Sequence, residues 1–221
     1  NLAVKEASGE ILGFLNNDLE IITDDWLSEM VSHVVRDGVG AVGARLWFPN
    51  NLIQHAGVIL GIGGIAGHGN KGIERGNPGY FNRAVLTQNF SAVTAACMLV
   101  ARNVFDEVNG FNERDLSVAF NDVDFCLRLG EKGYRIVYTP YAELYHYESA
   151  SRGYENTPKK FSRFEREAEY MKDKYKDILM NDPFYNPNLT LFNEDFSFAF
   201  PPRVGKPWRK KDRESKMRSE Q

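Results

Sequence analysis

The stretch "FNDVDFCLRLGEKGYRIVYT" at residues 120–139 predicts a helix followed directly by a strand. The helix begins near Asp122 and ends before Gly133, because glycine readily takes the left-handed conformation that closes a helix. The strand that follows stops before Pro140, which has no backbone donor. Asp122 and Asp124 lie among apolar residues of this helix. Carboxylates in such a setting either cap the element or serve a chemical role.

A second apolar stretch, "EILGFLNND" at residues 10–18, predicts a short strand buried on both faces of a sheet. It ends in Asn16, Asn17 and Asp18. These side chains would lie at the carboxyl edge of the sheet, where α/β proteins bind ligands.

The remaining periodicity predicts both helices and strands. Further strands are predicted at residues 40–48 and 91–100, and a helix at 102–110. Another helix is predicted from an N-cap at Thr23 to Gly38, and the longest one from Thr157-Pro158 to about Leu179. Residues 61–79 are rich in glycine and predict a long flexible loop. Strands and helices do not alternate strictly, so that an α/β fold with a mixed sheet fits best.

The composition is that of an ordinary globular protein, with 43% hydrophobic and 26% charged residues among 221. No apolar run approaches the roughly 20 residues of a membrane span. Cys97 and Cys126 lie in apolar surroundings and are expected to be buried free thiols. The net charge is −3, but residues 203–221 hold eight basic and three acidic residues. The body is therefore acidic, which argues against nucleic acid as a partner. The basic end is expected to be mobile, with attraction to anionic lipid headgroups as the alternative.

Three polar residues follow or begin predicted elements: Asp18 after a strand, Asp122 at a helix start and His146 at a strand end. Together with a phosphate-bearing ligand, two carboxylates and an imidazole suit Mg²⁺ or Mn²⁺. Each also has a simpler interpretation. Asp18 and Asp122 could cap the helices beside them, and His146 could be a half-buried histidine with a hydrogen-bond partner.

Five stretches in order resemble the bacterial family-two glycosyltransferases of the GT-A fold, most closely those that build surface polysaccharides such as O-antigen. They are "FLNNDLEI" (14–21), "VGARLWFPNNLIQHAGVILG" (42–61), "SAVTAACMLVAR" (91–102), "FNDVDFCLRLGEKGYRIVYTPYAELYHYESASRG" (120–153) and "DPFYNPNLTL" (182–191). The resemblance implies a GT-A-type mixed sheet flanked by helices. It covers residues 1–192, the C-terminal portion of such a domain, and leaves 193–221 as a basic, flexible tail.

The resemblance also implies a metal and diphosphate site. In the family, a strand ends in an Asp-x-Asp-type motif whose last acid binds Mg²⁺ or Mn²⁺, and Asp18 stands at that position. Asn16 replaces the first acid and can still form hydrogen bonds. His146 matches a histidine that completes the metal shell in many members. The residues placed to contact the donor diphosphate are Asn16, Asn17, Ser149 and Arg152.

A second landmark of the family is an acid pair that opens a helix, with the second acid as catalytic base. The pair reads Asn121-Asp122 here, so Asp122 is the expected base and the leading Glu is absent. Asp124 is expected to be structural, and Arg128 to form a buried ion pair. The residues expected around the acceptor and the donor sugar are His68, Thr94, Ala95, Ala96 and Asn121, with Lys71 as a further candidate near the acceptor.

The resemblance implies an inverting transferase that uses a UDP- or dTDP-sugar and a glycan or lipid-linked acceptor, in the cytoplasm or at the inner face of the membrane. One departure is large: the βα units that bind the nucleobase in the family would precede Asn1. A sheet cut there would expose an edge, which favours a homodimer. Two alternatives stay open. One is a non-enzymatic GT-A-like module that binds glycan or a partner transferase, and the other is a metal-dependent phosphohydrolase.

Overall fold

The computed structural model of the chain describes residues 1–147 and 158–204. The helices are α1 (Leu2–Glu6), α2 (Trp26–Val34), α3 (Arg102–Glu107), α4 (Asn121–Glu131), α5 (Pro158–Lys174) and α6 (Lys176–Met180), with short 3₁₀ turns η1 (Ile62–Gly64) and η2 (Tyr80–Asn82). The strands are β1 (Ile11–Leu15), β2 (Leu19–Ile21), β3 (Val39–Trp47), β4 (Ile53–His55), β5 (Val58–Leu60), β6 (Ala66–His68), β7 (Gln88–Phe90), β8 (Cys97–Ala101) and β9 (Arg135–His146).

The main sheet has the order β1-β8-β3-β9-β2, with β4 added to β3 and β7 added to β9. β3 and β9 pair in parallel at its centre, for example Val42 with Val137, and the other pairs are antiparallel. A separate pair is formed by β5 and β6. The predicted mixed sheet is therefore confirmed. Strands that are far apart in sequence meet at β9, which brings the beginning of the chain beside residue 146.

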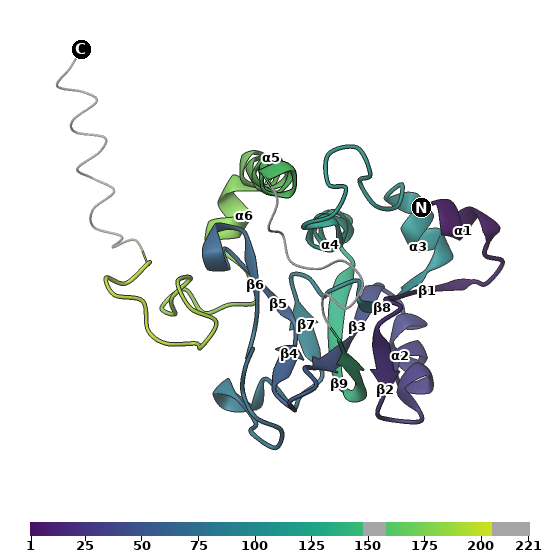
Figure 1. Cartoon of the computed structure of the whole chain (residues 1–221), viewed down its shortest axis with the longest axis horizontal. Helices are drawn as coiled ribbons and strands as arrows, with labels where there is room; N and C mark the ends of the chain where they lie inside the picture. The colour runs from purple at the N-terminus through teal and green to yellow at the C-terminus, as the bar shows by residue number, and fades with distance from the viewer. Residues whose placement is uncertain (148–157, 205–221) are drawn as a thin grey trace, which may run out of the picture.

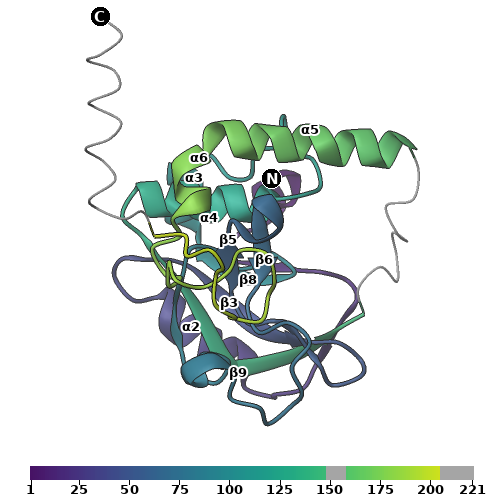
Figure 2. The same ribbon diagram turned by 90° about the vertical axis from the view of Figure 1, so that its left-hand side faces the viewer.

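The sheet divides the hydrophobic core in two, because successive residues of a strand point to opposite faces. Val42 packs with Met30 and Val34 of α2 on one face. Ala41 belongs to the larger cluster on the other face, together with Phe125 and Leu129 of α4. Figure 1 shows α2 on one side of the sheet and α3 and α4 on the other. In Figure 2, α5 runs beside α4 on the outside of that second layer.

The stretch at 120–139 folds largely as predicted. The helix α4 begins at Asn121, within one residue of the expected start, and Gly133 follows it with a φ of 87°. The strand is longer than predicted, because β9 continues through Pro140 to His146. The proline is accommodated where the register with β3 shifts, between the pairs Ala44–Thr139 and Arg45–Glu143. At such a bulge the missing donor interrupts no ladder hydrogen bond.

Two predictions around the first strand are wrong. β1 is not buried on both faces: Leu12 is buried but Leu15 is 47% exposed. The reason is that α2 packs mainly on β3, β8 and β9 and leaves the outer part of β1 uncovered. Thr23 is not the N-cap of α2, a position that Asp25 takes without a side-chain cap. Its hydroxyl instead accepts a 2.7 Å hydrogen bond from the backbone of Glu143 in β9.

Two further predictions need correction. Residues 61–79 are not one long irregular loop, because Ala66–His68 form β6 and pair with β5. The long helix expected from residue 157 to 179 is broken at Tyr175 into α5 and α6. Its expected start at Pro158 is confirmed.

The segment at residues 193–204 contacts the domain. Phe196 is buried, and the Arg203 guanidinium donates to the carbonyl of Leu189. Cys97 and Cys126 are free and buried, as predicted. Arg128 pairs with Asp124 at 2.8 Å, also as predicted. Across residues 1–147 and 158–204 no helix combines the length and apolar character needed to cross a membrane.

Candidate functional site

Asp18 and His146 are brought together by the pairing of β2 with β9. Leu19 lies opposite His146 in the antiparallel register, and the backbone N–H of Tyr147 donates to the carbonyl of Asp18 at 3.0 Å. The imidazole Nε2 of His146 then lies 3.2 Å from Oδ1 of Asp18 and 3.1 Å from Nδ2 of Asn16. Asp18 does not cap α2, whose N-cap is Asp25.

Gln54 of β4 sets the tautomer of His146. Its amide Nε2 donates to the backbone carbonyl of His146 at 3.3 Å, which fixes the orientation of the amide. The amide oxygen therefore faces Nδ1 of His146, at 2.6 Å, and can only accept. Nδ1 consequently carries a proton, and Nε2 faces Asn16 and Asp18. A second hydrogen bond of this kind is typical of histidines that ligate metals.

The pair has the properties of a cation site. Oδ1 of Asp18 is buried and accepts no hydrogen bond within the described part of the chain. Nε2 of His146 and this oxygen are 3.2 Å apart, a spacing that suits a direct ion pair with a protonated imidazole or a cation shared between the two atoms. Two neighbouring ligands of an octahedral cation are roughly 3 Å apart, which fits this spacing. One oxygen and one nitrogen ligand suit Mg²⁺ or Mn²⁺.

These two residues would not fill a coordination shell by themselves. Within residues 1–147 and 158–204, no three His, Cys, Asp or Glu side chains gather closely enough to hold a metal ion. Oxygens from a bound ligand would have to complete the shell. Diphosphate oxygens are ligands of that kind.

Asp122 is the second residue of α4, and its carboxylate contacts the backbone segment that adjoins the Asp18–His146 pair. Its Oδ2 accepts the N–H of Ala95 at 3.1 Å, and its Oδ1 accepts the N–H of Val123 at 2.9 Å. Burial raises the pKa of the Asp122 carboxyl above its ordinary value, while these two N–H groups and the Thr94 side chain oppose the rise. Asp122 does not cap α4, because the N-cap is Phe120. A half-buried carboxylate with raised basicity suits a general base.

The segment Thr94-Ala95-Ala96 connects the two parts of the site. Ala96 accepts the N–H of Asn16 at 2.9 Å, and Ala95 donates to Asp122. The segment lies close against β3 because Gly43 leaves room for it: a Cβ there would be 2.5 Å from Cβ of Val93. The candidate metal pair and the candidate base therefore border the same short piece of backbone.

A small cavity of about 160 Å³ adjoins this segment. Its lining residues are Gln54, His55, His68, Lys71, Thr94 and His146. The structure thus brings His68 and Thr94 beside His146. Gln54 and His55 were missed in the sequence. Their signal is two adjacent polar residues in an otherwise apolar strand, and both are buried.

The other predicted residues are placed as follows. Asn17 is exposed beside Asp18, and Asn121 is half-buried at the first position of α4. Ser149 and Arg152 lie outside the described residues, so their predicted role stays a prediction.

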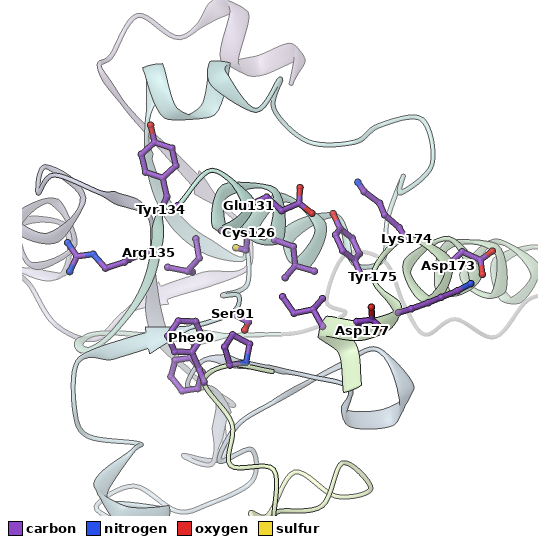
Figure 3. A pocket seen from close by; sticks show the side chains of 18 residues that line it. Phe90, Ser91, Cys126, Glu131, Tyr134, Arg135, Asp173, Lys174, Tyr175 and Asp177 are labelled. Atoms are coloured by element: carbon purple, nitrogen blue, oxygen red, sulfur yellow. The ribbon is translucent and has the colours of Figure 1, made fainter. Parts of the chain in front are cut away.

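A larger cavity lies elsewhere, with a volume of about 780 Å³. Figure 3 shows it between α4, the start of β9 and the junction of α5 with α6, with Cys126, Tyr134 and Tyr175 on its walls. Its lining residues include none of the candidate residues described above. Volume alone therefore does not mark the chemical site.

The chain is similar in sequence to several curated relatives, three of which are described here, while no family model matches it. The uncharacterized protein y4gI of Sinorhizobium fredii (strain NBRC 101917 / NGR234) is 53% identical over 91% of this chain. The O-antigen biosynthesis protein RfbC of Myxococcus xanthus is 42% identical over 93% of it. The N-acetylglucosaminyl-diphospho-decaprenol L-rhamnosyltransferase of Mycobacterium tuberculosis is 41% identical over 28% of it. The chain spans only 22%, 16% and 20% of the lengths of these relatives.

The fold is shared with solved glycosyltransferase structures, of which one is described here. The crystal structure of GalNAc-T7 with UDP, GalNAc and Mn²⁺ matches 80% of this chain and 35% of its own, with a TM-score of 0.57 and 13% identity. The mixed α/β architecture is that of the GT-A glycosyltransferases. The chain is thus similar to parts of relatives named for O-antigen biosynthesis and rhamnosyl transfer, and it shares the GT-A fold.

Proposed function

We propose that the chain is the catalytic portion of a metal-dependent, inverting glycosyltransferase of polysaccharide biosynthesis. Support comes from the names of two relatives, an O-antigen biosynthesis protein and a rhamnosyltransferase. The observation that carries the proposal is the contact of Asp18 with Nε2 of His146, beside the backbone segment that also holds Asp122. Two residues that could hold the cation and one that could act as the base would thus border the same backbone segment.

Asp18 and His146 would hold Mg²⁺ or Mn²⁺, with Asn16 and Asn17 near the nucleotide diphosphate and Ser149 and Arg152 as further diphosphate contacts. A divalent cation bound there would offset the charge that develops on the departing nucleoside diphosphate. Nδ2 of Asn16 lies 3.1 Å from the same Nε2, which has one lone pair, so a bound cation would replace the hydrogen bond that this amide can donate there.

Asp122 would act as the general base. Its carboxylate takes the proton of an acceptor hydroxyl while that oxygen attacks the anomeric carbon, on the face opposite the leaving diphosphate, so that the configuration inverts. The N–H groups of Ala95 and Val123 keep the carboxylate in one position. The side chains of His68, Thr94 and Asn121, with the small residues Ala95 and Ala96, would surround the sugars.

The proposed donor is a UDP- or dTDP-sugar and the proposed acceptor a glycan or lipid-linked glycan, at the cytoplasmic face of the membrane. A homodimer is also proposed. A monomer in light scattering at micromolar concentration would contradict the homodimer without affecting the rest.

The test is a calorimetric titration of the chain with UDP and dTDP, with and without Mn²⁺, for the wild type, Asp18→Asn and Asp122→Asn. We expect metal-dependent binding that Asp18→Asn abolishes and Asp122→Asn retains. In a transfer assay with an acceptor panel, Asp122→Asn should then lower turnover by about 10²–10⁴-fold. Metal-independent binding, or none, would contradict the proposal.

A second candidate is a GT-A-like module that binds nucleotide sugar or glycan without turnover. It is favoured by Asn16 and Asn121, which replace acids of the family pattern, and by the lack of a third metal-binding side chain in residues 1–147 and 158–204. Metal-dependent binding with no transfer to any acceptor, and no change of that outcome in Asp122→Asn, would favour this candidate.

A further inference from the structure

Three phenylalanines near residue 200 are almost fully exposed. Phe192, Phe198 and Phe200 have exposed fractions of 89%, 81% and 98%. A single exposed apolar residue is ordinary, but several large aromatic side chains in one short segment indicate an interaction surface. In Figure 1 the segment appears in yellow at the margin of the molecule, on the side away from α2. We refer to these three side chains as the phenylalanine surface.

A small hairpin holds the segment that carries the phenylalanine surface. The backbone N–H of Thr190 donates to the carbonyl of Ser197 at 2.8 Å, which joins the two arms of the hairpin. Successive residues of an extended segment point to opposite sides. Ala199 is buried against the domain, so its neighbours Phe198 and Phe200 both point away from the domain. The exposed rings therefore belong to an element with its own hydrogen bonds.

The inner side of the hairpin packs on the domain through Phe196. Its ring is buried and stacks on Tyr80 of η2, with 5.1 Å between the ring centroids. Phe81, whose ring contacts that of Tyr80, is itself 81% exposed and adds a fourth exposed ring beside the hairpin. The hairpin thus contacts the domain with one side and presents apolar rings on the other.

The same hairpin borders the candidate site. Glu194 lies between its two arms and accepts the backbone N–H of His68 at 2.9 Å. Its second oxygen lies 3.8 Å from Nζ of Lys71. His68 and Lys71 both line the small cavity beside His146. A partner that bound the phenylalanine surface would therefore be held close to the candidate site.

The sequence that follows the hairpin is strongly basic. Residues 205–221 hold seven Lys or Arg and three acids, and residues 206–211 alone hold four basic residues and no acid. Of the two acids in the hairpin, Glu194 faces Lys71, which leaves Asp195 as an opposing charge. Exposed aromatic rings enter the interfacial layer of a bilayer, and Lys and Arg beside them attract anionic headgroups. Stable attachment to a membrane takes two such signals, and both are present here.

We propose that the phenylalanine surface inserts into the interface of an anionic membrane and that the basic residues after it strengthen this attachment. The link to an acceptor rests on the proposed function, because attachment through the hairpin brings the candidate site to the surface that would carry a lipid-linked acceptor. Insertion itself requires neither UDP nor a metal ion. Membrane attachment and nucleotide binding can therefore be measured separately.

The test is cosedimentation of the whole chain with vesicles, without UDP or metal. One kind of vesicle is phosphatidylcholine alone, and the other is equal parts phosphatidylcholine and phosphatidylglycerol. We expect binding to the anionic vesicles that weakens as the salt concentration rises. The double variant Phe192→Ser, Phe198→Ser should lower the partition coefficient by about tenfold for each ring removed. Phe161→Ser, at a 57% exposed phenylalanine of α5, is the matched control and should leave it unchanged.

A second measurement follows insertion directly. After subtraction of the wild-type signal, the tryptophan emission of Phe192→Trp should shift to shorter wavelength when anionic vesicles are added, and that of Phe161→Trp should not.

Three results would each overturn the inference: no binding to anionic vesicles, equal binding to both kinds of vesicle, or equal binding of the double variant and the wild type. An oligomer in light scattering that the double variant abolishes, without vesicle binding, would show that a second copy covers the rings and would overturn it as well. Failure of UDP to bind with Mn²⁺ in the same preparation would instead contradict the proposed function and leave the vesicle result standing.

Discussion

The Nζ atom of Lys174 lies 2.8 Å from Oδ1 of Asp124 and joins α5 to α4 across 50 residues of sequence. Asp124 is fully buried, and it also accepts hydrogen bonds from Arg128 at 2.8 Å and Tyr175 at 2.7 Å. Burial alone would raise its pKa, but the three partners lower the pKa of Asp124 below its ordinary value. The helix that carries Asp122 is thus fixed from behind by an ionised carboxylate.

Asp124→Asn is expected to destabilise the protein by about 3 kcal/mol, because it leaves Arg128 and Lys174 near a group that no longer carries charge. Urea unfolding at pH 7 measures this. Lys174→Met should cost less, because Arg128 still neutralises Asp124 and the ammonium is partly exposed. The double variant should lose less than the sum of the two single losses. Strict additivity would show that the two charges do not interact.

Glu167 of α5 holds the loop that leads into α4. Its carboxylate is buried and accepts the N–H groups of Ser117, Val118 and Ala119 at 3.0, 3.2 and 2.7 Å. The hydroxyl of Ser117 donates as well, at 2.7 Å. These residues immediately precede Phe120, which has a φ of 60°, and Asn121. The Glu167 side chain therefore fixes the loop from which α4, the helix that carries the candidate base Asp122, begins.

Glu167→Gln should release this loop, because an amide offers one acceptor oxygen where the carboxylate offers two. We expect a loss of about 2 kcal/mol in stability and faster hydrogen exchange at the amides of residues 117–119. Glu165→Gln on the exposed side of α5 is the control and should change neither quantity. Unchanged protection at residues 117–119 in Glu167→Gln would show that the loop is held by other contacts.

The positions of those site residues that follow an apolar run could be predicted from the sequence. Contacts that depend on which strands pair could not. Asp18 and His146 each follow a strand pattern, so their placement at a sheet edge could be expected. Their contact depends on the pairing of β2 with β9, which involves residues about 130 apart and leaves no local signal. Gln54 and His55 are buried polar residues in a three-residue strand. Only the position of that strand against β3 gives them a role.

Contacts between residues far apart in sequence also explain where the fold predicted from the sequence was wrong. Thr23 is a good N-cap residue by type, but a hydrogen bond with β9 was available to its hydroxyl. The glycines of residues 61–79 weaken any periodicity, and β6 forms because β5 lies beside it as a template.

Gln54→Leu tests whether the second hydrogen bond of His146 supports metal binding. Without the amide oxygen, Nδ1 loses its acceptor and the ring can take the other tautomer, with the proton on Nε2 facing Asp18. We expect the affinity for Mn²⁺ in the presence of UDP to fall by about 10–100-fold. Gln88→Leu, a half-buried glutamine in β7, is the matched control. Equal Mn²⁺ affinities in the two variants would show that the hydrogen bond from His146 to Gln54 does not contribute to metal binding.

His68 makes the stability of the protein depend on pH in a defined window. The pKa of His68 is about 4 in the folded chain, whereas an unfolded histidine titrates near 6.5. Above pH 6.5 neither state binds the proton, so His68 contributes no pH dependence there. Between pH 6.5 and about 4 the unfolded chain binds a proton that the folded chain does not. Stability therefore falls as the pH is lowered, by at most about 3 kcal/mol for this residue, and levels off below pH 4.

The measurement is urea unfolding of the wild type and His68→Asn at intervals between pH 4 and 7.5. Asparagine does not titrate. In this window the unfolding free energy of the variant should therefore depend less steeply on pH, by an amount that corresponds to at most one bound proton. The lowered pKa of His55 leaves part of the slope in place, because that ring also resists protonation in the folded state. The carboxylates of the protein titrate in the same way in both chains and cancel in the comparison. Parallel curves for the two proteins would show that the pKa of His68 is the same in the folded and the unfolded chain, and would contradict its lowered value.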